Sequence, residues 1–91
     1  MKVFDSSLSL VKCLSSQPRP LGIVPTMGAL HRGHLSLIEK ALEENQTVLI
    51  SIFINPTQFN DKNDFENYPF QIDSDLEKIK KYGDKIFVYV P

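Results

Sequence analysis

Apolar residues along the chain fall into short continuous runs that alternate with stretches of helical spacing. Three continuous runs, rich in β-branched residues, predict buried strands at residues 21–24, 47–54 and 86–90. Between the first two, Leu35, Ile38 and Leu42 recur at helical spacing and predict a helix over about residues 34–45. The pattern therefore predicts a βαβ unit with parallel strands, joined by a right-handed crossover.

The N-terminal region predicts a short edge strand at residues 1–4, followed by a helix. Asp5, Ser6 or Ser7 is a suitable N-cap for that helix. Its expected apolar positions are Leu8, Val11 and Leu14. Two prolines within residues 15–20 predict a loop that leads into the next strand.

The C-terminal half predicts a second helix at residues 72–82. Ser74 and Glu77 have the spacing of a capping box, and Gly83 stands where a helix commonly ends. On this assignment Asp73 and Asp75 are charges that favour the helix N-terminus, a simpler interpretation than metal binding. The polar, acidic residues 61–69 before it predict a long loop of the kind that covers a site.

Composition places the chain among single small globular domains. It has 91 residues, of which 42% are hydrophobic and 23% are charged. The formal net charge of -1 gives no general attraction to nucleic acid or to acidic membranes, so any anion binding must be local. A single cysteine, no apolar run of membrane length and no signal-peptide pattern predict a cytoplasmic location.

Both histidines of the protein lie in one glycine-containing turn between a predicted strand and a predicted helix. His31 and His34 flank Gly33, and Gly28 precedes them. In parallel α/β sheets ligands bind where strands end in such turns, and free N–H groups at a helix start favour an anion. The turn thus predicts a phosphate site. An incidental pair of loop histidines, or a zinc site still lacking its third ligand, is the alternative.

A second polar segment follows the next predicted strand, at the same edge of a parallel sheet. It runs through residues 55–60, in which Gln58 offers two donors and one acceptor for a neutral or carboxylate ligand. Asn55 and Asn60 are better explained as turn residues. Gln58 is therefore the candidate for binding a second substrate beside the phosphate.

Residues 25–34 (PTMGALHRGH), together with residues 51–59 (SIFINPTQF) and Tyr68-Pro69, resemble the pantothenate synthetase family, also called pantoate:β-alanine ligases. H-x-G-H alone marks a broader adenylyl-transfer superfamily, whereas the two extended motifs at this spacing are specific. The resemblance covers nearly the whole chain. It implies an α/β, Rossmann-like nucleotidyltransferase fold with a parallel sheet. It also implies a cytoplasmic homodimer that uses ATP and Mg²⁺ to join pantoate to β-alanine through a pantoyl adenylate.

The resemblance also assigns roles to residues of this chain. The implied ATP-binding residues are Met27, Gly28, Ala29, Leu30, His31, Arg32, Gly33 and His34. His34 is the implied catalytic proton donor and His31 its partner on the phosphates, while Gln58 and Met27 are the implied pantoate and β-alanine contacts. No metal ligand in the chain is implied. Arg32 and Phe70 depart from the residues that the family more often has at their positions.

The resemblance further implies that residues 1–91 are the N-terminal part of an ATP- and pantoate-binding domain. The family's later ATP-binding motif, second glutamine and C-terminal domain have no counterpart before Pro91. We therefore expect activity only in a longer enzyme. Two other expectations follow from the predicted topology: that the last strand, at residues 86–90, has an unpaired edge, and that the lysines of the second helix lie away from the turn.

Two alternatives to a ligase remain open on the sequence alone. Another adenylyltransferase with an H-x-G-H motif would keep the ATP turn but would not need the segment around Gln58. A nucleotide-binding fragment without catalysis would keep binding and lack turnover.

Overall fold

The computed structural model describes the backbone of residues 1–54 and 62–91, with side chains described for residues 1–54 and 71–91. Eight elements follow one another along this part of the chain: β1 (Lys2–Phe4), α1 (Ser7–Leu14), β2 (Leu21–Thr26), α2 (Arg32–Glu44), β3 (Thr47–Ile52), α3 (Lys62–Ile79), η2 (Lys80–Tyr82) and β4 (Ile86–Tyr89). Strands and helices alternate, as the hydrophobic pattern predicts for an α/β protein.

The four strands form one parallel sheet in the order β1-β4-β3-β2. This confirms the parallel α/β fold and the βαβ unit made by β2, α2 and β3. The expectation of an unpaired last strand is wrong, because β1 pairs with β4 on the side away from β3. The N-terminal strand therefore covers the edge that sequence reasoning left open, and β1 and β2 form the two edges of the described sheet.

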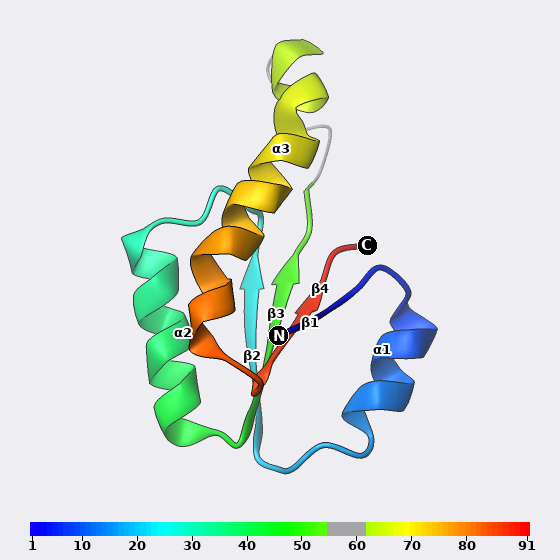
Figure 1. Cartoon of the computed structure of the whole chain (residues 1–91), viewed down its shortest axis with the longest axis vertical. Coiled ribbons are helices and arrows are strands. Elements are labelled where there is room, and N and C mark those ends of the chain that lie inside the picture. The colour runs from blue at the N-terminus through cyan, green and yellow to red at the C-terminus, as the bar shows by residue number, and fades with distance from the viewer. Residues whose placement is uncertain (55–61) are drawn as a thin grey trace.

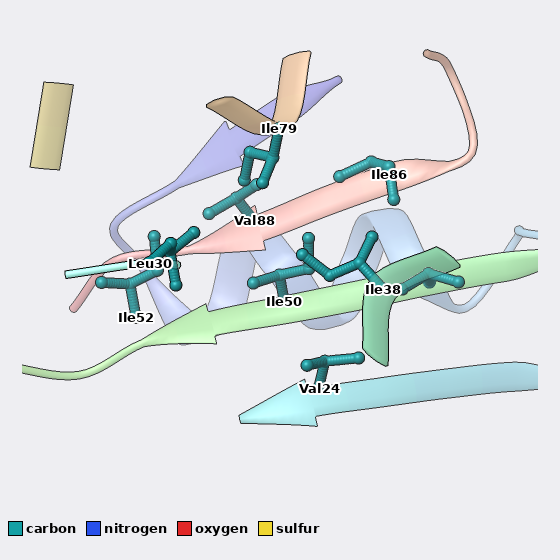
Figure 2. Close-up of a cluster of buried hydrophobic side chains, with 9 residues drawn as sticks. Val24, Leu30, Ile38, Ile50, Ile52, Ile79, Ile86 and Val88 are labelled. Carbon is teal, nitrogen blue, oxygen red and sulfur yellow. The ribbon is translucent and has the colours of Figure 1, made fainter. Parts of the chain in front are cut away.

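Helices cover both faces of the sheet, with α2 and α3 on one side and α1 on the other (Figure 1). Side chains alternate along β3, so Val48, Ile50 and Ile52 join the core beneath α2 and α3, while Leu49 joins the core beneath α1. Figure 2 shows the larger core, in which Ile38 of α2 and Ile79 of α3 meet the strand residues. This double cover explains why β3 is apolar at nearly every position.

Helix α1 begins where predicted, with Ser6 as its N-cap, but its buried face differs from the prediction. Leu10 and Leu14 are buried against Leu49 and Phe87, one on β3 and one on β4. Leu8 and Val11 are instead 71% and 63% exposed. Of the three predicted positions only Leu14 is buried, because the helix is short and apolar residues occur on more than one of its faces.

Helix α3 corrects the largest prediction about secondary structure. It begins at Lys62, so the backbone of residues 62–69 is helical rather than a covering loop, and Ser74 with Glu77 is not a capping box. The capping-box spacing of Ser74 and Glu77 and the polar composition of residues 61–69 led the local rules to start the helix later. Tertiary context overrides such propensities. Helix α3 ends at Ile79 and η2 continues to Tyr82, so the helical structure ends just before Gly83, as predicted. The φ of Gly83 is 88°.

None of the helices in the described part of the chain has the length and apolar character that a membrane span requires.

Candidate functional site

The turn between β2 and α2 leaves the sheet at the carboxyl end of β2. Thr26, the last residue of β2, pairs with Ile52, the last residue of β3, so both strands end at the same level. The Thr26 hydroxyl donates to the Ser51 carbonyl at 3.0 Å and accepts from the Gly28 N–H at 3.3 Å. Sequence reasoning missed this anchoring role of Thr26, which fixes where the turn begins.

Two successive residues of the turn have left-handed backbone conformations. Gly28 has a φ of 84° and Ala29 a φ of 53°. A left-handed residue with a Cβ costs about 1–2 kcal/mol, so Ala29 needs support from elsewhere in the fold. A Cβ on Gly28 would lie 3.2 Å from Ile54 Cδ1 and 3.4 Å from Asp75 Oδ2, which leaves little space for a side chain there.

The two histidines cap the start of α2 with their ring nitrogens. His31 is the N-cap, and its Nδ1 accepts from the Gly33 N–H at 3.0 Å. The Nδ1 atom of His34 accepts in turn from the His31 N–H at 3.1 Å. An Nδ1 that accepts a hydrogen bond carries no proton, so each neutral ring carries its proton on Nε2. The backbone thus fixes both imidazoles as Nε2–H donors.

The rings lie together at the surface. Their centroids are 4.2 Å apart, His31 is exposed and His34 is half-buried. A Cβ on Gly33 would lie 2.8 Å from Cε1 of His31, so the glycine makes room for the His31 ring. Within the described part of the chain neither Nε2 has a hydrogen-bond partner. The predicted pairing of the two imidazoles at one helix start is therefore present in the structure.

The expected row of free N–H groups at the helix start is only partly present. The N–H groups of Gly28, Ala29, Leu30, His31 and Gly33 are all bonded within the protein. These five amides are therefore not available to a ligand, and the phosphate site at the helix start stays a prediction. The turn uses these amides to hold its own shape. The donors that remain for a ligand include the two Nε2–H groups of His31 and His34.

Two residues of α3 hold the turn from the other side. Asp75, which is 1% exposed, accepts from the Ala29 N–H at 3.0 Å and from the Leu30 N–H at 2.8 Å. Lys78 Nζ donates to the Leu30 carbonyl at 2.8 Å. Hydrogen bonds to a charged group contribute about 1.5–3 kcal/mol each, enough to offset the left-handed conformation of Ala29.

Both of these residues were placed elsewhere by sequence reasoning. Asp75 is neither a charge at a helix N-terminus nor exposed, and Lys78 does not lie away from the turn. One feature of the sequence could have revealed Asp75: it occupies the position four residues before Ile79, on the apolar face of α3. A carboxylate on a buried face requires hydrogen-bond donors from the neighbouring element.

The predicted ATP-binding residues of the turn differ in how exposed their side chains are. Arg32 is exposed at the first helical position, and the Met27 side chain is 63% exposed. Leu30 is 2% exposed, so its side chain belongs to the core rather than to a ligand surface. Gln58, Asn55 and Asn60 lie outside the described residues, as do the side chains of Tyr68 to Phe70.

A further contact fixes the α2 helix behind the histidines. The Tyr82 hydroxyl donates to Glu39 Oε2 at 2.6 Å and so joins η2 to α2. Burial, the hydrogen bond to Glu39 and the nearby negative charge of Glu39 raise the pKa of Tyr82 to about 12, opposed in part by Arg32.

Among the described residues no group of three or more His, Cys, Asp or Glu side chains is placed to hold a metal ion.

The chain is similar in sequence and in fold to pantothenate synthetases. The Phocaeicola vulgatus pantothenate synthetase is 51% identical over 83 residues, which cover 91% of this chain and 29% of that protein. The Flavobacterium psychrophilum enzyme is 52% identical over 73 residues, which cover 80% of this chain and 26% of that protein. The chain thus spans about a third or less of the length of these relatives.

Solved structures give the same result. The pantoate-beta-alanine ligase of Francisella tularensis, complexed with beta-gamma ATP and beta-alanine, superposes with a TM-score of 0.77 at 40% identity, over 99% of this chain and 35% of that one. The Thermus thermophilus pantothenate synthetase superposes with a TM-score of 0.70 at 34% identity, over 100% of this chain and 32% of that one. The Pantoate-beta-alanine ligase family model matches residues 2–91. This chain belongs to the pantoate-beta-alanine ligase family.

Proposed function

We propose that this chain supplies the ATP-binding turn of a pantoate:β-alanine ligase, as the N-terminal part of its Rossmann-like ATP- and pantoate-binding domain. The observation that carries the proposal is the pair of imidazoles at the start of α2. Both Nδ1 atoms are occupied by backbone N–H groups, and both Nε2–H groups are left as donors. Two neutral donors side by side suit the oxygens of a phosphate chain.

The proposed reaction has two steps. In the first, the carboxylate of pantoate attacks the α-phosphorus of ATP, an oxygen–phosphorus bond forms, and pyrophosphate leaves with the electrons of the broken bond. Negative charge grows on the phosphate oxygens during this step, and His31 and His34 donate hydrogen bonds to them from Nε2. In this geometry the proton-donor role of His34 is donation of a hydrogen bond that strengthens as the charge grows, and the proton stays on the ring. In the second, the neutral amine of β-alanine attacks the acyl carbon, the carbon–oxygen bond to AMP breaks with its electron pair going to AMP, and the nitrogen releases one proton to solvent as the amide forms.

Gln58 and Met27 are the proposed contacts for pantoate or β-alanine. Support comes from the order of the chain, because the segment that bears Gln58 leaves β3 at the sheet edge where the histidine turn leaves β2. Its neutral amide can bind a carboxylate or hydroxyl without the permanent ion pair that a cation would form. The related Francisella tularensis enzyme was crystallised with a β,γ-ATP ligand and β-alanine.

Magnesium and a second subunit belong to the proposal as well. Mg²⁺ is expected as part of the MgATP substrate, since phosphate oxygens are its usual ligands and the described residues offer it no cluster of their own. The longer enzyme that contains this segment is expected to work as a cytoplasmic homodimer, as its resemblance to the family implies.

Pantoate-dependent exchange of labelled pyrophosphate into ATP tests the proposal. The assay is run on the 91-residue chain and on a full-length enzyme that carries this segment. We expect exchange in the longer enzyme and, at most, ATP binding by the 91-residue chain. Exchange that does not depend on pantoate would point to a different adenylyltransferase, and binding without exchange in either form would point to a nucleotide-binding protein.

Substitution of Gln58 tests the second half of the site. In the full-length enzyme Gln58→Ala is expected to weaken the use of pantoate or β-alanine by about 1–3 kcal/mol, the scale of leaving a polar partner unpaired. The affinity for ATP is expected to stay nearly constant. A matched control is Gln46→Ala, an exposed amide at the opposite end of β3. An equal loss of ATP affinity would place Gln58 on the nucleotide instead.

A further inference from the structure

A buried carboxylate on α3 is bonded to the histidine turn, 45 and 46 residues away in sequence. Both oxygens of Asp75 accept N–H groups of the turn, Oδ2 from Ala29 and Oδ1 from Leu30. The side chain is 1% exposed. A carboxylate so deeply buried is stable only when donors satisfy its oxygens, and here both donors come from the turn.

One helical turn further along α3, Lys78 completes the contact. Its ammonium group donates to the carbonyl oxygen of Leu30 at 2.8 Å. The N–H and the C=O of Leu30 are therefore both bonded to side chains of α3, and its own side chain is packed in the core with Ile79 (Figure 2). The backbone and the side chain of Leu30 are thus both held in place. Because His31 is the next residue in the chain, its backbone position is restricted as well.

The turn has few other means of keeping this shape. Ala29 has a φ of 53°, a conformation that alanine rarely adopts, and Gly28 before it has a φ of 84°. Apart from the contact of Gly28 with the Thr26 hydroxyl, the hydrogen bonds described above for residues 28–30 go to α3. If the α3 contacts were lost, residues 28–30 would be free to return to commoner conformations, and the His31 backbone would move with them.

We propose that Asp75 and Lys78 are positioning residues for adenylation, which hold the Leu30 peptide groups and thereby the imidazoles of His31 and His34. The inference rests on the proposed function, since it names what keeps that site in working geometry. In this proposal neither Asp75 nor Lys78 contacts ATP. Both oxygens of Asp75 are used inside the protein, and its burial leaves no face for a substrate or a metal ion.

The physical reason is the sensitivity of catalysis to small displacements. A misplacement of about 1 Å in a group that aligns reactants can lower a rate about 100-fold, even when the altered residue lies outside the chemistry. The capping bonds of His31 and His34 set their tautomers and ring directions only while the His31 backbone is in place. The hydrogen bonds from Asp75 and Lys78 of α3 to the turn supply the supporting contacts that such a site requires.

The first test is Asp75→Asn in a full-length enzyme that carries this segment. An amide keeps the size of the side chain and one acceptor, but its NH₂ group then faces an N–H donor of the turn. We expect kcat for pantoate-dependent pyrophosphate exchange to fall about 10- to 100-fold, with KM for ATP changed by less than about threefold. The matched control is Glu77→Gln, the same chemical change at an exposed position of α3, which is expected to leave both constants unchanged.

A spectroscopic measurement separates positioning from general loss of stability. ¹⁵N NMR of the histidine rings in the 91-residue chain is expected to show Nδ1 as an unprotonated acceptor and Nε2 as protonated in both residues. In Asp75→Asn the two ring signals are expected to shift toward the average of the two tautomers, while Glu77→Gln keeps the original pattern. This readout needs no turnover, so it tests the α3 contacts even if the proposed ligase function fails.

Lys78 provides a second, milder variant for the case in which Asp75→Asn does not fold. Lys78 is an exposed residue, so Lys78→Met is expected to fold, to lower kcat about three- to tenfold and to broaden the same ring signals. Lys78→Arg, which can still donate to the Leu30 carbonyl, is expected to restore most of the rate. Lys81→Met, which removes an ammonium near the Tyr82 ring instead, serves as the control.

The proposal is overturned if folded Asp75→Asn or Lys78→Met keeps both its kcat and the histidine tautomer pattern of the unaltered protein. It is also overturned if kcat falls equally in the control variants. Absence of exchange in the unaltered full-length enzyme, with the ring pattern altered as expected in Asp75→Asn, would instead contradict the ligase function and retain the positioning role.

Discussion

The two helices that follow β1 and β2 begin in contrasting ways. Helix α1 begins at Ser6, whose hydroxyl accepts from the Ser9 N–H at 3.4 Å, and this exposed cap involves only neighbouring residues. Helix α2 begins at His31, where two imidazoles make the capping bonds and α3 holds the residue before them. Serine is among the best N-caps, and histidine is not among the preferred ones.

The α1 start is stabilised by a local cap, whereas the α2 start carries the candidate site and depends on distant contacts. A serine at the α2 start would cap that helix with fewer supporting contacts, whereas the histidine cap needs a glycine for space and a buried carboxylate behind it. A weaker local choice that the fold supports by distant contacts is typical of a functional site. Substitutions at the two helix starts are therefore expected to affect activity and stability differently.

His34→Ala is expected to lower adenylate formation in the full-length enzyme by about two orders of magnitude or more, the scale of losing one donor to developing charge. Pyrophosphate exchange measures the effect. Ser6→Ala at the other helix start is the control, expected to lower the free energy of unfolding by about 1 kcal/mol and to leave exchange unchanged. Nearly intact exchange in His34→Ala would show that the imidazole does not act at the phosphates.

His31→Ser exchanges the functional cap for the kind of cap that α1 uses. We expect exchange to fall at least about tenfold because one Nε2–H donor is lost. The free energy of unfolding in urea is expected to stay constant or to rise by about 1 kcal/mol, since serine is the better cap. A parallel loss of stability and activity would mean that the imidazole is needed mainly for the fold.

Gly28→Ala tests how tightly the α2 start is held. Its positive φ and the contacts that a Cβ would make with Ile54 and Asp75 predict a loss of about 1–2 kcal/mol in the free energy of unfolding. Gly83→Ala is the matched control, with a similar φ of 88° and no atom within 4 Å of the added Cβ. Equal losses measured by urea unfolding would show that crowding at the turn contributes nothing.

The smallest effect concerns the contact between Tyr82 and Glu39 behind α2. The pKa of Tyr82 is raised from its ordinary value near 10 to about 12 by burial and by Glu39. The folded state therefore retains the phenol proton more strongly than the unfolded state, and this stability is present below about pH 10 and lost as the pH rises toward about 12. Tyr82→Phe is expected to lack this part of the decline, measured as the urea midpoint between about pH 9 and about pH 12.

Much of the fold follows from local pattern. The strands β2, β3 and β4, the helix between β2 and β3 and the Ser6 cap all depend on residues close together in sequence, which is why periodicity and capping rules found them. The prediction that β2 is buried is wrong, because β2 lies at the edge of the sheet and Ile23 is 61% exposed. The same locality explains the errors. The stripe of α1 and the start of α3 depend on what each helix packs against, and no spacing rule contains that information.

The family and the pairing of His31 with His34 could be read from the amino-acid sequence, because both are carried by one continuous motif. The pairing of β1 with β4, and the contacts of Asp75 and Lys78 with Leu30 across 45 and 48 residues, emerged from the fold. Such contacts arise from strand order and from the path of α3 back over the sheet (Figure 1). A residue's own neighbours in sequence set its conformational preferences, whereas its hydrogen-bond partners when buried are set by the whole fold.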